Sequence, residues 1–140
     1  MRQIGAAGAV LLKNTGSLPL MKPRSLIVVG NDAAPALRGP NGFDDRRGDD
    51  GVLAMGWGSG TAEFPYLITP LEALQARARQ DRSRVDWYLD NWDLAGAAKA
   101  VQLKDVALVF ANADSGEQYI TVDGNEGDRF VPFIHVSRTS

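Results

Sequence analysis

The amino-acid sequence predicts an α/β fold, namely a partial parallel-sheet α/β sandwich made of three β-α units of an incomplete doubly wound domain. Three short apolar segments carry this prediction, because each is long enough for one strand and each ends at polar or glycine residues. Two segments with helical features lie between them. Strands that alternate with helices are typical of crossover connections and a parallel sheet. Three strands make a small sheet for this architecture, so we expect the sheet to be incomplete.

The strands are predicted from runs of branched apolar residues. Ser25 to Val29 reads SLIVV and is closed by Gly30, which suits a strand buried on both faces. Val85 to Leu89 is the second candidate. The third is Asp105 to Ala111, with the sequence DVALVFA.

The helices are predicted from capping residues and from apolar spacing. Thr69 can cap a helix, Pro70 suits its first position, and Glu72 lies three residues after the cap. A stripe at helical spacing follows, formed by Leu71, Leu74 and Ala78. Leu94 to Leu103 is a second helix, and Arg2 to Leu12 is a short helix that runs into an extended segment.

Composition and charge exclude several classes of protein. The chain has 140 residues, which is about one domain, and its formal net charge of −2 gives no reason to expect a nucleic-acid partner. It has no cysteine, so disulfides and thiolate metal sites are excluded. No apolar run approaches the roughly 20 residues that span a bilayer, so no membrane partner is expected. The first ten residues lack the pattern of a signal peptide, so the signal of a secreted parent protein is expected upstream.

Residues 30–65 are rich in Gly, Asp and Pro and show no clear period, which predicts a long loop that is functional or packed on itself. Gly56 to Gly60 resembles a dinucleotide loop only in part, because Thr61 stands where the last glycine is needed. A tight turn with Trp57 packed beneath it is the preferred interpretation. The acidic pairs at 44–45 and 49–50 lack the alternating spacing of a calcium loop, so no metal is expected.

The aromatic residues Trp87, Tyr88 and Trp92 gather around the second strand. Two interpretations are open for them: core or interdomain packing, which we prefer, and a platform for carbohydrate.

The segment that leaves the third strand holds the best candidates for chemistry. Ligands bind beyond the carboxyl ends of the strands in open parallel sheets, and residues 112–119 (NADSGEQY) begin there. Glu117 could donate a proton to a leaving oxygen, and Tyr119 could offer a ring face to a sugar. A polar loop with a capping Asp114 and an inward-facing tyrosine remains the alternative from spacing alone.

Several blocks of sequence, in the same order, resemble fungal β-glucosidases of glycoside hydrolase family 3. Residues 105–129, DVALVFANADSGEQYITVDGNEGDR, are similar to the strand, the Asp-Ser-Gly-Glu-Gly-Tyr loop and the Gly-Asn-x-Gly-Asp-Arg turn of that family. Earlier similar blocks are VLLKN at 10–14, LPL at 18–20, GPNG at 39–42 and LAMGWGSGTA at 53–62. The similarity covers residues 2 to 129.

The resemblance implies roles for three residues. Glu117 corresponds to the general acid/base of a retaining mechanism, with Tyr119 and Ser115 as substrate-binding residues. The nucleophile of the family is an aspartate on a preceding (β/α)8 barrel domain, which this chain lacks. The implied substrates are cellobiose and short oligosaccharides with terminal β-D-glucose, in extracellular cellulose degradation. The implied chemistry needs no cofactor and no metal.

The resemblance also divides the chain. Residues 1–24 are expected to lead from the missing barrel, 25–129 to form part of the family's C-terminal domain, and 130–140 to be a discordant tail. Phe43 and Gly48 stand where the family often has a disulfide, so packing or hydrogen bonds must hold that loop. Gln118 stands where the family has glycine. The alternatives to a β-glucosidase fragment are a non-catalytic sugar-binding or interaction domain and a non-functional truncated gene product.

Overall fold

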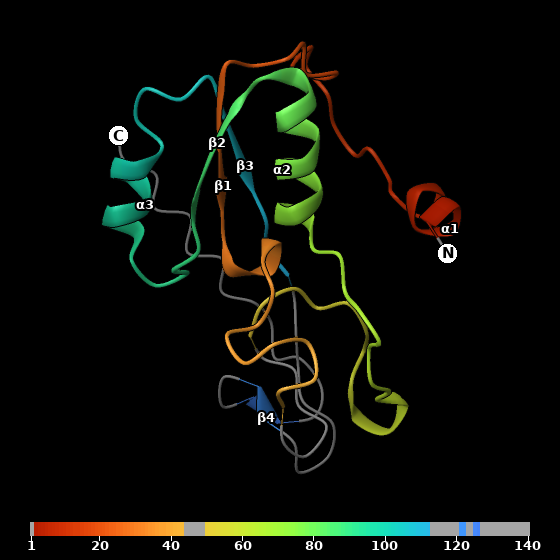
Figure 1. Cartoon of the computed structure of the whole chain (residues 1–140). Coiled ribbons are helices and arrows are strands. Elements are labelled where there is room, and N and C mark those ends of the chain that lie inside the picture. Colours follow the sequence, from red (N-terminus) through yellow and green to blue (C-terminus); the bar gives the residue numbers. More distant parts are fainter. Residues whose placement is uncertain (1, 44–49, 113–120, 123–124, 127–140) are drawn as a thin grey trace.

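The computed structural model of the chain describes residues 2–43, 50–112, 121–122 and 125–126. Figure 1 shows a small parallel sheet with one helix on each side and a group of loops at one end. The elements, in chain order, are α1 (Arg2–Ala7), β1 (Ser25–Val29), η1 (Asn31–Ala33), η2 (Gly58–Gly60), α2 (Pro70–Asp81), β2 (Arg84–Tyr88), α3 (Leu94–Ala100), β3 (Val106–Val109), β4 (Thr121–Val122) and β5 (Asn125–Glu126).

The predicted parallel α/β architecture is confirmed. The three-stranded sheet has the order β2-β1-β3, and both strand pairs are parallel. Leu26 of β1 lies opposite Val85 of β2 on one side and Val106 of β3 on the other. A separate antiparallel pair joins β4 to β5. The first strand has the predicted bounds, while the other two begin or end one or two residues from the predicted positions.

Strand β1 forms the centre of the core because it is buried on both faces. Leu26, Ile27 and Val28 are 6%, 1% and 0% exposed, as the continuous apolar run predicts. Leu26 and Val28 belong to the main apolar cluster, together with Ala33, Ala34 and Leu71. Successive side chains of a strand point to opposite faces, so Ile27 lies on the other face.

Helix α2 covers one face of the sheet and starts as the sequence predicts. The Thr69 hydroxyl accepts a hydrogen bond from the Glu72 backbone N–H at 3.3 Å, and Pro70 occupies the first turn. Leu71 and Ala78 of the predicted stripe are buried, with Leu74 packed partly against the core. The helix ends at Arg82, which is in the left-handed conformation with φ 58°.

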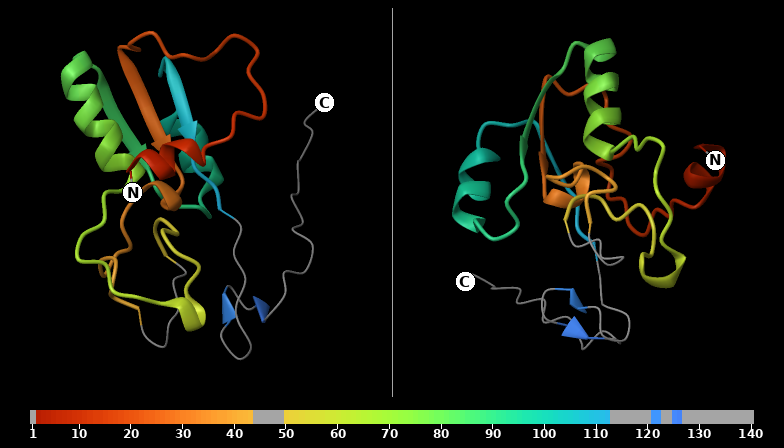
Figure 2. Two further views of the ribbon diagram at one scale, coloured as in Figure 1. Left: turned by 90° about the vertical axis from the view of Figure 1, so that its right-hand side faces the viewer. Right: turned by 60° about the horizontal axis from the view of Figure 1, so that its bottom comes forward.

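Helix α3 lies on the opposite face of the sheet, as the two views of Figure 2 also show. It begins with Asp93 as its cap, whose carboxylate accepts from the Gly96 N–H at 2.8 Å. It ends at Ala100, three residues before the predicted end. Leu103 has φ 60° and is fully exposed, so the last predicted residues form a turn instead of continuing the helix.

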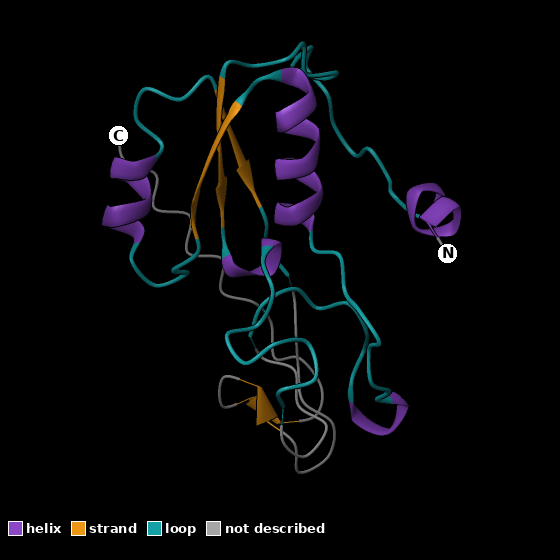
Figure 3. Cartoon of the chain, viewed as in Figure 1, coloured by secondary structure: helices purple, strands orange, loops and turns teal. Residues whose placement is uncertain are grey.

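The segment before β1 is helical only over Arg2–Ala7 and is then extended, and none of the helix's residues is buried. Figure 3 shows this helix set apart from the sheet on the α2 side. Asn14 closes the predicted turn, because its Oδ1 accepts from the backbone N–H groups of Gly16 and Leu18, both at 3.1 Å. None of the described helices is long and apolar enough to cross a membrane.

The amino ends of β1 and β3 are joined through Asp105, which directly precedes β3. Its carboxylate Oδ2 accepts from the backbone N–H groups of Arg24 at 2.9 Å and Ser25 at 3.0 Å. The Ser25 N–H is the main reason that the pKa of Asp105 lies below its ordinary value. Asp105 was predicted to be the first residue of the third strand. In the structure it lies just before β3, and its side chain fixes the alignment of β3 with β1.

We expect opposite effects from adding a methyl group to two glycines. Gly30 has φ 101°, and a Cβ there would lie 2.1 Å from the Phe110 carbonyl oxygen, so Gly30→Ala should lower the free energy of unfolding by at least about 2 kcal/mol. Gly5 lies in α1 with nothing within 4 Å of an added Cβ, so Gly5→Ala should be neutral or stabilise by up to about 1 kcal/mol. Urea denaturation measures both; equal losses would contradict the fold at Gly30.

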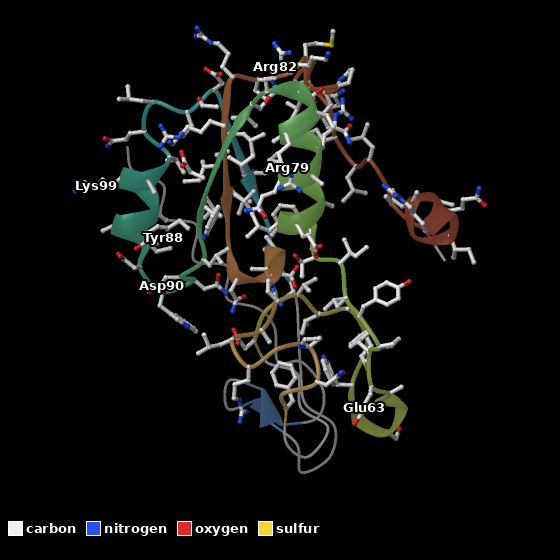
Figure 4. All side chains as sticks on the ribbon, in the orientation of Figure 1. Glu63, Arg79, Arg82, Tyr88, Asp90 and Lys99 are labelled. Atoms are coloured by element: carbon white, nitrogen blue, oxygen red, sulfur yellow. The ribbon has the colours of Figure 1, made fainter. Side chains whose placement is uncertain are left out.

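The Asp105 interaction predicts a stability difference that depends on pH. The pKa of Asp105 is lower in the folded than in the unfolded protein. The stabilisation from its ionised carboxylate is therefore complete at pH values above the unfolded pKa of about 3.9, and it is lost as the pH falls through the folded pKa. The urea midpoint of Asp105→Ala should therefore lie below that of the wild type at pH 7, and the two should converge in acid. Glu63→Ala is the control, because Glu63 is exposed and lies on a loop away from the sheet (Figure 4). A gap that persists unchanged at pH 2 would refute the mechanism.

Candidate functional site

The candidate site lies at the carboxyl ends of the three strands, where parallel sheets bind their ligands. In Figure 1 this is the lower end of the sheet, where η1 and the loop from β1 to α2 meet the chain leaving β3. The Phe110 N–H donates to the Val29 carbonyl at 2.8 Å, and the Gly30 N–H donates to the Tyr88 carbonyl at 3.0 Å. These bonds extend the sheet ladder to its last residues, so the loops start from a fixed base.

Two asparagines join the loop after β1 to the loop after β2. The Asn31 backbone N–H donates to Asn91 Oδ1 at 2.9 Å, and Asn91 Nδ2 donates to Asn31 Oδ1 at 3.0 Å. Asn31 lies two residues after the end of β1, and Asn91 lies three residues after the end of β2. The reciprocal pair therefore holds the carboxyl edges of neighbouring strands at a set separation.

Asp32 joins the same loop to the chain that leaves β3. Its Oδ1 accepts from the Leu53 backbone N–H at 3.0 Å and from Asn112 Nδ2 at 3.3 Å. Asn112 is the last described residue before the segment that holds Glu117. One carboxylate thus contacts both loops that border the candidate site.

Asp50 folds the long loop back on itself. Its Oδ2 accepts from the Leu37 backbone N–H at 2.7 Å, and its Oδ1 accepts from Asn31 Nδ2 at 3.4 Å. The Val52 N–H then donates to the Ala34 carbonyl at 2.8 Å. The prediction that this loop packs on itself is confirmed for its described part.

Trp57 packs between two aromatic rings in the same loop. Its ring centroid lies 5.0 Å from Phe43 and 6.4 Å from Phe64, both in edge-to-face geometry. Asn41 fixes Phe64 through two 2.7 Å hydrogen bonds to its backbone. The turn over Gly58–Gly60 follows Trp57, so the predicted tight turn is confirmed. Phe43 stands where the resemblance puts a cysteine and contributes ring packing instead.

Trp57 has two unfavourable features, a strained backbone conformation and an indole N–H without a hydrogen-bond partner among the described residues. Its φ is 58°, a value that side chains disfavour, and its buried Nε1 has no hydrogen-bond partner among the described residues. Aromatic packing therefore has to offset both costs.

The aromatic cluster around β2 does not pack in the core. Trp87 is 51% exposed and Trp92 is 84% exposed, so neither lies in a core formed by the described residues. Interdomain packing, the other half of the preferred interpretation, stays a prediction. The Tyr88 hydroxyl donates to the Asp93 carboxylate at 2.5 Å, which raises the pKa of Tyr88 and lowers that of Asp93. Figure 4 shows Tyr88 and Asp90 near the carboxyl end of β2, on the side of α3.

The three residues predicted to act on substrate, Glu117, Tyr119 and Ser115, lie outside the described residues, as do Gln118, Gly48 and the 130–140 segment. Two residues around the site, Asp32 and Asn91, were not predicted from the sequence, whereas Asn112 is the first residue of the predicted candidate segment. A usable signal was present, since each is an Asp or Asn within three residues of a predicted strand end. No group of three or more His, Cys, Asp or Glu side chains that could hold a metal occurs in the described part of the chain.

Comparison with known proteins gives the family. Residues 9–132 match the glycosyl hydrolase family 3 C-terminal domain. Among curated proteins, a probable β-glucosidase A of Aspergillus oryzae is 52% identical over 130 residues, and β-glucosidase 1 of Aspergillus aculeatus is 50% identical over the same length. Both matches cover 92% of this chain and 15% of the relative.

Solved structures agree with that result. A glycoside hydrolase family 3 β-glucosidase of Neurospora crassa is 56% identical, and a β-glucosidase of Chaetomium thermophilum is 58% identical. Each superposes with a TM-score of 0.83 over 91% of this chain and 15% of that chain. The chain therefore spans about 15% of the length of the relatives that it matches.

The packing of Trp57 predicts that its ring matters more than its N–H. Trp57→Phe keeps the edge-to-face contacts and removes the unpartnered donor, so the free energy of unfolding should change by less than about 1 kcal/mol. Trp57→Ala removes the ring from between Phe43 and Phe64 and should cost about 3 kcal/mol. Urea denaturation followed by far-UV circular dichroism measures both. Equal losses would contradict this account.

Proposed function

Because this chain belongs to the glycosyl hydrolase family 3 C-terminal domain family, we propose that it forms the acid/base half of a retaining β-glucosidase. The observation that supports the proposal is that the Asp-Ser-Gly-Glu motif directly follows the segment that leaves β3. The chain leaves β3 at the carboxyl edge of the sheet through Asn112, and the Asp-Ser-Gly-Glu motif follows directly at residues 114–117. This edge is where open parallel sheets present their functional groups.

Glu117 is proposed as the general acid/base. In the first step its protonated carboxyl group gives a proton to the glycosidic oxygen while a carboxylate nucleophile attacks the anomeric carbon. In the second step the Glu117 carboxylate takes a proton from water, which then releases the sugar from the nucleophile. Tyr119 and Ser115 are proposed to bind the substrate beside it.

The nucleophile must come from another part of the intact enzyme. A retaining pair needs its two carboxyl groups about 5–5.5 Å apart, and the family resemblance assigns the second one to an aspartate on a (β/α)8 barrel domain. We propose that residues 1–24 lead from that barrel, that 25–129 form part of the C-terminal domain, and that 130–140 are a separate tail. The chain's share of about 15% of its relatives supports a partner domain of this kind.

We propose terminal β-D-glucosyl residues of cellobiose and short oligosaccharides as the substrate. The supporting observation is that these curated relatives and solved structures, 50% to 58% identical over the aligned segment, are named β-glucosidases. An extracellular role of the parent enzyme in cellulose degradation is part of the same proposal.

The separated chain should not hydrolyse glucosides. Without a barrel, Glu117 has no nucleophile opposite it, and a proton donor alone does not complete a retaining hydrolysis. We expect the purified 140-residue chain to release no p-nitrophenol from p-nitrophenyl β-D-glucoside above the buffer rate. Release that Glu117→Gln abolishes would contradict the need for a barrel. Calorimetry with cellobiose on the same sample would reveal a binding domain instead.

The role of Glu117 can be tested by restoring the missing domain. Residues 9–129 would replace the matching segment of the Aspergillus oryzae relative, and Glu117→Gln would then be compared with the parent chimera. We expect kcat/KM for cellobiose to fall by about 10²–10⁴-fold, the usual contribution of general acid/base catalysis. Glu126→Gln, in the same segment, is the matched control and should change it less than about threefold. Equal effects of the two variants would refute the assignment.

A further inference from the structure

We infer that Asp32 and Asn112 form a positioning pair that sets the base of the Glu117 loop, an inference that rests on the function proposed above. The two residues are 80 positions apart in the chain, and Asn112 Nδ2 donates to Asp32 Oδ1 at 3.3 Å. Neither residue touches the reacting atoms in this account. Each acts through the place where it holds the chain.

Asp32 is held firmly enough to serve as an anchor. It lies in η1, where the Ala33 N–H donates to the Gly30 carbonyl and the Ala34 N–H donates to the Asn31 carbonyl. The oxygen that accepts from Asn112 also accepts from the Leu53 N–H at 3.0 Å. Ala33 and Ala34 are buried in the main apolar cluster, so this turn is fixed by the core on one side.

The chain leading to Asn112 is fixed as far as Phe110. The Phe110 N–H donates to Val29 at 2.8 Å, and the Phe110 carbonyl lies so close to Gly30 that a Cβ there would clash. Beyond Phe110, the hydrogen bond from Asn112 to Asp32 is the side-chain contact that ties this part of the chain to another described residue. It is therefore the last tie before the segment that carries Glu117.

The distance along the chain makes this tie important. Glu117 follows Asn112 by five residues, and five residues span at most about 17 Å. A general acid has to lie within about 2.6–3.2 Å of the oxygen that it protonates, and a displacement of about 1 Å is enough to slow catalysis severely. A fixed start to a short segment limits where its carboxyl group can go.

The chemical types of the pair suit this task. The Asp32 carboxylate accepts two N–H donors without needing a positive partner, and the Asn112 amide can donate without adding a charge near Glu117. A basic residue in place of Asn112 would bring a positive charge to the site and favour ionised Glu117, which opposes its role as an acid.

The test uses the full-length chimera that carries residues 9–129, with two substrates that differ in leaving group. The glucose that leaves from cellobiose is a poor leaving group and needs a proton. The 2,4-dinitrophenolate that leaves from 2,4-dinitrophenyl β-D-glucoside is a good leaving group and departs without one. We expect Asn112→Ala to lower kcat/KM for cellobiose by about tenfold, as the loss of one hydrogen bond allows. For the dinitrophenyl substrate, kcat/KM should stay within about twofold of the parent, because bond cleavage there does not use the acid.

Further variants separate positioning from general damage to the loop. Asp32→Asn keeps an oxygen that can accept from Leu53 and Asn112, so it should retain most of the cellobiose activity, whereas Asp32→Ala should not. Asn41→Ala is the matched control, because Asn41 closes the same loop through two hydrogen bonds to Phe64, whereas the described partner of Asn112 is Asp32. It should lower the rates for both substrates alike or leave both unchanged.

The outcomes distinguish this inference from the proposed function. If Glu117→Gln spares cellobiose hydrolysis, the proposed function fails and the inference fails with it. If Glu117→Gln removes that activity but Asn112→Ala leaves it unchanged, or lowers both substrates equally, the positioning role alone is overturned. A selective loss on cellobiose, with rescue by Asp32→Asn, supports it.

Discussion

The structure depends on one strand that is buried on both faces. β1 lies between two parallel neighbours, and the side chains of Ile27 and Val28 are almost fully removed from water. Burial of this kind is the main favourable term in folding, and it fixes both the sheet order and the face against which α2 packs. Every loop that borders the candidate site starts at the end of β1 or of a strand paired with it.

At the carboxyl ends of the strands, polar side chains hold the loops in place through hydrogen bonds. Asp32, Asp50 and Asn91 accept hydrogen bonds from backbone N–H groups of the long loop. Asn91 does so from the chain that follows β2, and Asp32 also contacts Asn112 in the chain that follows β3. Backbone groups in a loop have no ladder to pair them, so side-chain acceptors take over that task. The same residues that fold the loop therefore determine where the neighbouring loops begin, which links stability and the proposed catalysis through shared contacts.

The proposed chemistry also accounts for the division of labour between domains. A proton donor and a nucleophile on separate domains can be brought to the required spacing only when both domains are present, so neither acts alone on a glycosidic bond. Among the described residues, β3 is an edge strand whose outer backbone groups have no strand partner, and the exposed Trp87 and Trp92 leave apolar surface. Both features fit a segment that spans a small share of its relatives.

The sequence by itself determined the alternation of strands and helices, the buried run at 25–29 and the capped start of α2, because apolar period and caps act over a few neighbouring residues. It also carried the family resemblance that assigns a role to Glu117. Only the tertiary structure decided that α3 ends early, that Trp87 and Trp92 face solvent, and that Asp32 meets Asn112. Asp32 and Asn112 lie 80 positions apart, and local patterns contain no information on which distant partner a side chain will find.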